Sequence, residues 1–132
     1  MSAPDFSWKG MINMCSGMGL LAKELYVYFT VPTNGMEPLG EHLEAHLAYQ
    51  KKIQDDGIMV AAGPLRDPDK NDWEGEGMII IRAESLEEAK KIADADPMHA
   101  NGARSYTIRP WLMNEGKITV EMTFSDKSAE LV

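Results

Sequence analysis

Apolar positions recur with two different periods along this chain, and each period predicts one kind of element. Between residues 39 and 53 the period is that of a helix, about 3.6 residues. The apolar positions of one side are Leu39, Leu43, Leu47 and Ile53. His46 falls in the middle of this stripe. Because an amphipathic helix packs its apolar side on a sheet, we expect His46 to point into the fold.

Segments rich in β-branched and aromatic residues predict strands at residues 25–31, 58–62, 77–82 and 105–109. A second helix is predicted from the capping box Ser85–Glu88 to Asp96, since the residue before Pro97 avoids the helical region. The order strand, helix, strand, strand, helix, strand is the ferredoxin-like βαββαβ pattern. We therefore predict an α+β fold with an antiparallel sheet and two helices on one face.

The first strand carries apolar residues on both of its faces. We expect the aliphatic face, beginning at Leu25 and Val27, to pack on the helices. The other face, with Tyr26, Tyr28 and Thr30, is then expected to line a cavity or a subunit contact. Since a bare apolar sheet face is unfavourable in water, we expect a homodimer or a higher homo-oligomer.

The two ends of the chain extend this pattern. Residues 1–23 are interpreted as a short helix or arm that packs on a neighbouring subunit or over a cavity; a loose terminal segment is the alternative. Residues 24–124 are predicted to form a single domain. It includes an extra strand at residues 117–124, where apolar and polar residues alternate. Residues 125–132 are predicted to be a frayed tail.

Composition narrows the classes of partner. The chain has 132 residues and a net charge of −8, which argues against nucleic acid or an anionic membrane surface as partner. A single cysteine, Cys15, fits the reducing cytoplasm. No apolar run reaches transmembrane length and no signal peptide is evident, so we expect a cytoplasmic protein.

His46 is the clearest candidate for a catalytic residue. Asp96 continues the inner stripe of the second helix, so the two side chains could meet at one edge of the sheet. A carboxylate bonded to one imidazole nitrogen fixes the tautomer and equips the ring as a general base. From spacing alone, however, a core histidine that bonds a backbone carbonyl is favoured. His42 lies one turn before His46, but no third ligand accompanies this pair, and we expect no metal and no cofactor.

Several motifs, in the same order along the chain, resemble those of the YCII-related family. They are His46-Leu47-Ala48-Tyr49, residues 57–65, residues 83–89, residues 95–99 and Pro110-Trp111. The resemblance implies a dimeric α+β barrel, in which two ferredoxin-like sheets pack face to face. It also implies a histidine–aspartate site, which falls on His46 and Asp96. One branch of the family is a dehydrochlorinase of a chlorinated hydroxyhydroquinone, and muconolactone isomerases share the barrel.

With the resemblance added, two functions remain open. The first is a cofactor-free acid–base enzyme, a lyase or isomerase, that acts on a small cyclic or aromatic compound through His46 and Asp96. Its candidate pocket residues are Tyr26, Tyr28, Trp73 and Arg109, of which Arg109 could hold an anionic group. The second is a non-catalytic dimeric module that binds a small molecule. Tight binding without product would indicate the second.

Overall fold

Two compact units make up the described part of the chain. The computed structural model describes residues 4–132, so residues 1–3 of the predicted N-terminal arm lie outside the described residues. One unit spans residues 24–112, and the other combines residues 4–23 with residues 113–132. The residues predicted to carry chemistry all belong to the first unit.

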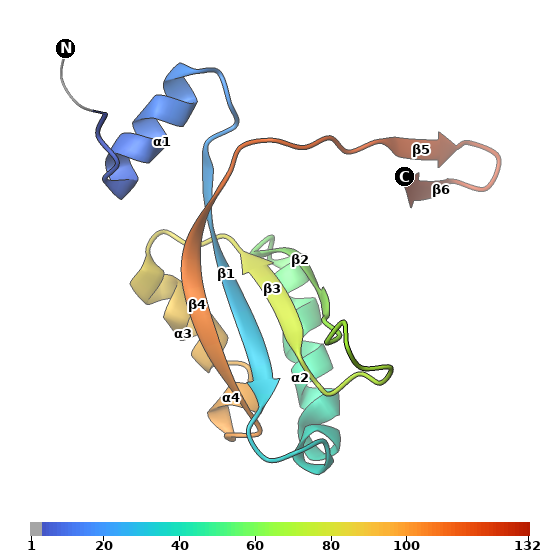
Figure 1. Cartoon of the computed structure of the whole chain (residues 1–132). Coiled ribbons are helices and arrows are strands. Elements are labelled where there is room, and N and C mark those ends of the chain that lie inside the picture. Colours follow the sequence, from blue (N-terminus) through green and yellow to red (C-terminus); the bar gives the residue numbers. More distant parts are fainter. Residues whose placement is uncertain (1–3) are drawn as a thin grey trace. The chain divides into compact units, whose positions relative to one another are not determined.

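A four-stranded sheet forms the first unit's front layer (Figure 1). Its strands are β1 (Lys23–Pro32), β2 (Met59–Pro64), β3 (Gly77–Ile81) and β4 (Arg104–Met113), in the order β2-β3-β1-β4. β3 is antiparallel to both of its neighbours. The register sets Gly77 opposite Thr30 on one side and opposite Pro64 on the other, which brings three chain segments together at one end of the sheet.

Three helices cover the same face of this sheet (Figure 1). They are α2 (Glu37–Asp55), α3 (Leu86–Asp94) and the short α4 (Pro97–Ala100). The predicted capping box begins α3, where the Ser85 hydroxyl accepts a hydrogen bond from the Glu88 amide at 3.1 Å. The predicted ferredoxin-like α+β fold is confirmed. The sequence did not predict α4, whose separate turn begins where Asp96 caps it.

The core lies between this sheet and α3. Tyr26 and Tyr28 are buried against Ala89 and Ala93 of that helix, together with two isoleucines of β3. The expectation that the tyrosines line the face opposite the helices is therefore wrong. Leu25 and Val27 alternate with them and lie on the other face. Both faces of β1 carry apolar side chains, so the alternation shows which residues share a face but not which face meets the helices.

α2 packs through a narrower stripe than its apolar pattern predicts. Leu39 and Ile53 are buried as expected, and His46 lies between them on the same stripe. Leu43 and Leu47 instead remain 48% and 57% exposed. The prediction that these two leucines pack on the sheet is wrong; they flank the buried stripe and line a pocket beside it.

The second unit contains one helix and a hairpin. The predicted N-terminal helix is present as α1 (Trp8–Gly17), which begins where the Ser7 hydroxyl accepts from the Gly10 amide. The C-terminal segment forms β5 (Val120–Thr123) and β6 (Ser128–Leu131), which pair with each other. Residues 125–132 therefore contain a strand where the sequence predicts a frayed tail, and residues 113–124 group with this unit rather than with the sheet domain. No helix within residues 4–132 is long and apolar enough to cross a bilayer.

Candidate active site

His46 and Asp96 come from two helices that pack against each other. His46 lies near the middle of α2, and Asp96 is the N-cap of α4, which packs on α2. The His46 Nδ1 atom lies 2.9 Å from Asp96 Oδ1 and 2.8 Å from Oδ2. Asp96 is 1% exposed, and its Oδ1 also accepts the Met98 amide at 2.9 Å. The carboxylate is thus held from two sides, and it in turn fixes the imidazole ring.

The surroundings of Asp96 favour its charged form. Burial opposes ionisation, but the hydrogen bonds from His46 and the Met98 amide, together with the nearby histidine rings, outweigh it and lower the pKa of this carboxyl. An ionised carboxylate only accepts hydrogen bonds, so the Nδ1–H of His46 donates to it. The Nε2 atom of the neutral ring then keeps its lone pair, as a general base requires.

A pocket of about 290 Å³ lies beside this pair. Apolar groups of α2, β2 and β3 supply most of its wall, including Leu43, Leu47 and Pro64. Its polar groups are few, and they come from Thr30, His46, Gln50, Glu76 and Arg104. A largely apolar pocket with a few converging polar groups is the usual form of a small-molecule site.

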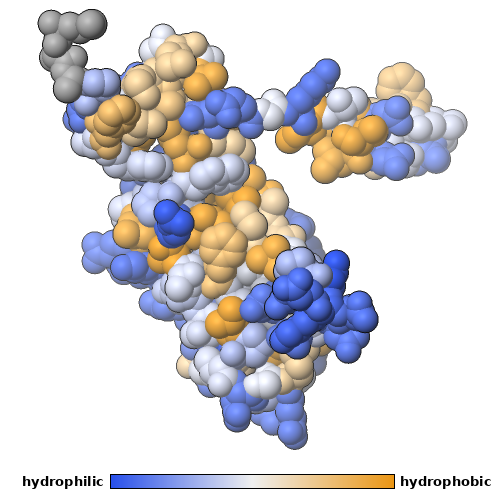
Figure 2. All heavy atoms as spheres, viewed as in Figure 1, coloured by the Kyte–Doolittle hydropathy of each residue, from blue (hydrophilic) through white to orange (hydrophobic). Residues whose placement is uncertain are grey.

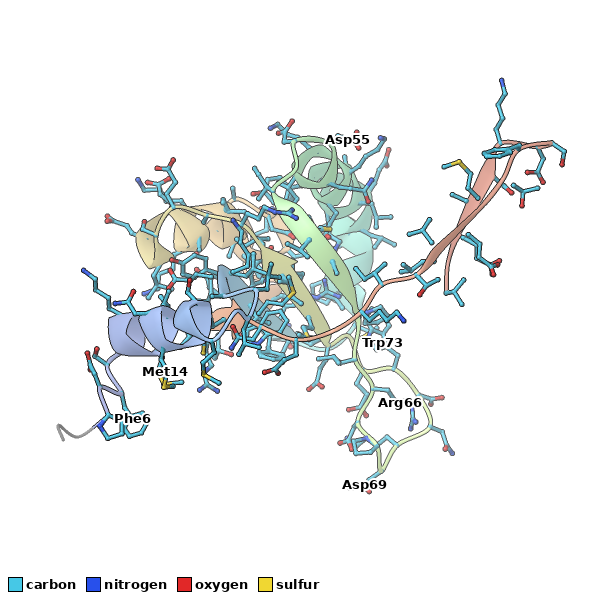
Figure 3. The ribbon with its side chains drawn as sticks, turned by 90° about the horizontal axis from the view of Figure 1, so that it is seen from above. Phe6, Met14, Asp55, Arg66, Asp69 and Trp73 are labelled. Atoms are coloured by element: carbon cyan, nitrogen blue, oxygen red, sulfur yellow. The ribbon has the colours of Figure 1, made fainter. Side chains whose placement is uncertain are left out.

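Trp73 is the predicted pocket residue that lines this cavity, in addition to His46. It belongs to the loop between β2 and β3. Figure 3 shows Trp73 next to the strands, whereas Asp69 lies at the far end of the same loop. The indole Nε1–H donates to the Glu76 carbonyl at 2.7 Å, which fixes the plane of the ring.

Three other predicted pocket residues do not line the cavity. Tyr26 and Tyr28 lie in the core, and Arg109 is exposed on β4. Side chains alternate along a strand, so Arg109 lies on the face opposite that of Tyr106 and Ile108, which pack on the core. A different arginine of the same strand, Arg104, lines the pocket instead.

A second histidine, His99, lies next to the pocket and is linked to it through Thr30. His99 belongs to α4, and its Nδ1–H donates to the Ala93 carbonyl at 2.6 Å. Its Nε2 therefore accepts from the Thr30 hydroxyl at 2.9 Å, and Thr30 lines the cavity. Burial lowers the pKa of His99 and so favours its neutral ring. The only sequence feature that could have indicated this place for His99 is its position three residues after Asp96.

Residues 25–112 match the profile of the YCII-related domain. The chain belongs to this family. The resemblance identified from its motifs is thereby confirmed, and the matched segment coincides with the first unit, which contains the whole candidate site. Within residues 4–132, no group of three or more His, Cys, Asp or Glu side chains could hold a metal ion.

This chain is similar to curated proteins and to solved structures. The uncharacterized protein YjpA of Bacillus subtilis is 29% identical over 91 residues, which are 69% of this chain and all of YjpA. The protein YciI of Escherichia coli is 38% identical over 72 residues, 51% of this chain and 74% of YciI. The structure of 5-chloro-2-hydroxyhydroquinone dehydrochlorinase (TftG) from Burkholderia phenoliruptrix AC1100, in complex with 2,5-dihydroxybenzoquinone, superimposes with a TM-score of 0.56 at 20% identity. It covers 66% of this chain and 92% of that one, and it shows a shared fold.

Proposed function

We propose that this protein is a cofactor-free acid–base enzyme of the lyase or isomerase class, in which His46 is the base and Asp96 its orienting partner. The observation that carries the proposal is the contact of His46 Nδ1 with both oxygens of Asp96 beside a largely apolar pocket. An imidazole held in this way needs no further group to accept a proton.

The arrangement supports a simple proton-transfer cycle. Nε2 of His46 takes a proton from a hydroxyl group or ring carbon of the substrate, and the electron pair left behind expels a leaving group or moves within the ring. The buried Asp96 carboxylate stabilises the imidazolium that forms. In an isomerisation the proton returns to another atom of the ring. In a dehydrochlorination chloride departs, and the proton passes to water.

The substrate that fits best is a small cyclic or aromatic compound. The pocket volume suits one ring with small substituents, and Trp73 offers a flat wall to it. The fold neighbour is a dehydrochlorinase of a chlorinated hydroxyhydroquinone, and its complex holds a planar quinone. These two likenesses favour hydroxylated or chlorinated rings as the first compounds to test.

Association of two copies through the sheet is part of the proposal. The face opposite the helices carries apolar side chains that remain partly exposed; Figure 2 shows apolar groups gathered over the strands. Phe29, Val31 and Trp111 share that face by alternation and are 37–39% exposed. A second sheet would remove them from water. We also propose a cytoplasmic location, because the single cysteine fits a reducing compartment.

Turnover of a panel of catechols, lactones and chlorinated hydroxyquinols tests the function. For any compound that the native protein turns over, His46→Ala should reduce kcat by about 10²–10⁴-fold, which is the usual rate contribution of a general base. Asp96→Asn should cause a similar loss while the fold is kept, because asparagine still caps α4 but can stabilise the wrong tautomer. His42→Ala, one turn away on the same helix, is the matched control and should keep its activity.

Two results would contradict the proposal. One is turnover that survives His46→Ala. The other is tight binding of a ring compound with no product formed from any member of the panel, which would indicate the non-catalytic binding module instead.

A further inference from the structure

Arg104 is a buried cation without a bonded counter-charge. It is 8% exposed at the first position of β4, and it lines the same pocket as His46. No residue among 4–132 forms an ion pair with it, and its Nε atom has no hydrogen-bond partner within that range. A desolvated guanidinium is unfavourable unless its donors are satisfied, so this side chain is incomplete without a further group.

The nearby carboxylates do not complete it. Asp96 lies close enough for its charge to favour the guanidinium, but its two oxygens are bonded to His46 and to the Met98 amide. Glu76 also lines the pocket, yet it is exposed and makes no ion pair with Arg104. The donors of Arg104 thus remain available on the pocket side.

The Trp73 ring lies against the guanidinium of Arg104. The Arg104 Cζ atom lies 5.9 Å from the centre of the indole ring, within the range of a cation–π contact. Because the Trp73 Nε1–H is bonded to the Glu76 carbonyl, the ring is oriented before any ligand arrives. The pocket therefore presents a flat aromatic wall next to a preorganised fork of donors.

We propose that Arg104 and Trp73 form a subsite for an anionic oxygen substituent, a phenolate, enolate or carboxylate, on a planar ring. The guanidinium donates to the anionic oxygen, and the ring lies against the indole. With a chain charge of −8, the protein as a whole does not attract anions, so selection for charge must come from this local cation. This inference rests on the proposed function, because the subsite and the His46–Asp96 pair share one pocket. It adds the class of substrate that this pocket would bind.

The subsite also bears on the chemistry. When His46 removes a proton from a ring compound, negative charge grows on the ring and its oxygens. A guanidinium already aimed at such an oxygen stabilises that charge without reorganising. Arg104 is thus a binding and specificity residue, distinct from the base.

Calorimetric titration with two isosteric probes tests the inference. The probes are 2,5-dihydroxybenzoate, which is anionic, and 2,5-dihydroxybenzamide, which is neutral. We expect the native protein to bind the benzoate more tightly, and Arg104→Gln to weaken benzoate binding by about tenfold to a hundredfold with little effect on the amide. Arg104→Lys should restore part of the preference, since it keeps the charge but not the fork. Arg109→Gln, on the other face of the same strand, should match the native protein.

Equal affinity of the native protein for the two probes, or no binding of either, would overturn the inference. So would an effect of Arg109→Gln as large as that of Arg104→Gln. If Arg104→Gln does not fold, as judged by circular dichroism, the Arg104→Lys protein decides, because it must still prefer the benzoate. The His46→Ala protein separates the two proposals: selective benzoate binding that persists without any turnover supports this subsite even if the catalytic proposal fails.

Discussion

Asp96 caps α4 and orients His46 with the same carboxylate. Its Oδ1 accepts the Met98 amide, while both oxygens contact His46 Nδ1. The cap fixes the carboxylate relative to the backbone, so the imidazole is aligned by a group that cannot rotate freely. A carboxylate without such a backbone contact would fix the orientation of the imidazole ring less well.

His99, which is half-buried, should make the stability of the protein depend on pH. Burial lowers the pKa of His99, and the charges of Arg104 and His46 lower it further. The hydrogen bond to the Ala93 carbonyl and the charge of Asp96 act in the opposite direction but do not outweigh burial. A depressed pKa in the folded state contributes stability that is present above the unfolded value, near 6.5, and lost as pH falls through the folded pKa. The free energy of unfolding in urea should thus be lower at about pH 5.5 than at about pH 7.5.

His99→Gln removes this titration and provides the control. The variant should show a smaller difference in unfolding free energy between the two pH values than the native protein. A proton NMR titration that places the His99 pKa above the ordinary value would contradict the prediction.

Buried Tyr28 and half-buried Tyr49 should respond differently to loss of their hydroxyls. The Tyr28 hydroxyl has no hydrogen-bond partner within residues 4–132, so Tyr28→Phe should change the free energy of unfolding by less than about 0.5 kcal/mol, or increase it. The Tyr49 hydroxyl donates to the Ile92 carbonyl, and Tyr49→Phe should cost about 1 kcal/mol. Chemical denaturation of both variants measures this, and a larger loss for Tyr28→Phe than for Tyr49→Phe would contradict it.

Individual residues show what the sequence could predict. Helical spacing correctly predicted that the His46 side chain points into the fold, because residues three and four positions apart lie on the same face of a helix. Arg109 was proposed for the pocket and Arg104 was missed, because the predicted strand began at Ser105 and so left Arg104 outside it. The alternation of β4 puts Arg104 on the face of Tyr106, but no pattern in the sequence tells which face meets the helices.

At the scale of elements, the loop between β2 and β3 depends on one glycine. Gly75 has φ +90°, and a Cβ built on it would lie 2.5 Å from the Pro32 Cγ and 2.9 Å from the Leu39 Cδ1. Gly75→Ala should therefore destabilise the protein by about 1–3 kcal/mol. It should also weaken ligand binding, because Trp73 and Glu76 flank the turn. Thermal unfolding with and without ring compounds measures both effects.

Gly40→Ala is the matched control for that substitution. Gly40 lies in α2, and a Cβ at this position would point into open space, with no neighbouring side chain of residues 4–132 within 4 Å. Alanine there should stabilise the helix by about 0.5–1 kcal/mol. A neutral effect of Gly75→Ala would show that the loop is less constrained than its geometry indicates.

The exposed leucines of α2 show why element prediction has limits. Leu43 and Leu47 share the apolar side of the helix, yet they border the pocket rather than the sheet. The helical period predicts which residues share a side, but the width of the buried stripe depends on the neighbours. α4, which packs on α2, is a single turn and too short to leave a periodic signal.

At the scale of the whole molecule, sedimentation should show a stable dimer at micromolar concentration. Phe29 lies on the sheet face that the helices leave open, and Phe29→Glu should shift the protein toward monomer by placing a charge in the contact. Lys90→Glu, on the exposed side of α3, should not. A native protein that sediments as a monomer would contradict the proposed pairing of sheets.

β5 falls within the strand predicted at residues 117–124, whereas β6, the second strand of the C-terminal hairpin, lay beyond sequence prediction for a physical reason. The residues from Ser128 to Leu131 are exposed and short of strand-forming residues, and they are extended only because β5 pairs with them. Pairing partners of this kind depend on register, which a single sequence does not specify. The family domain, by contrast, contains every element that positions His46 and Asp96.

The tautomer of His46 decides whether this ring can act as the base, and nitrogen-15 NMR of the imidazole measures it without a substrate. We expect the neutral ring to carry its proton on Nδ1, bonded to Asp96, and to leave Nε2 unprotonated toward the pocket. Asp96→Asn should shift the ring toward the Nε2–H form, since an amide can donate to Nδ1. A native His46 protonated on Nε2, or a tautomer unchanged by Asp96→Asn, would contradict the assignment of His46 as the base.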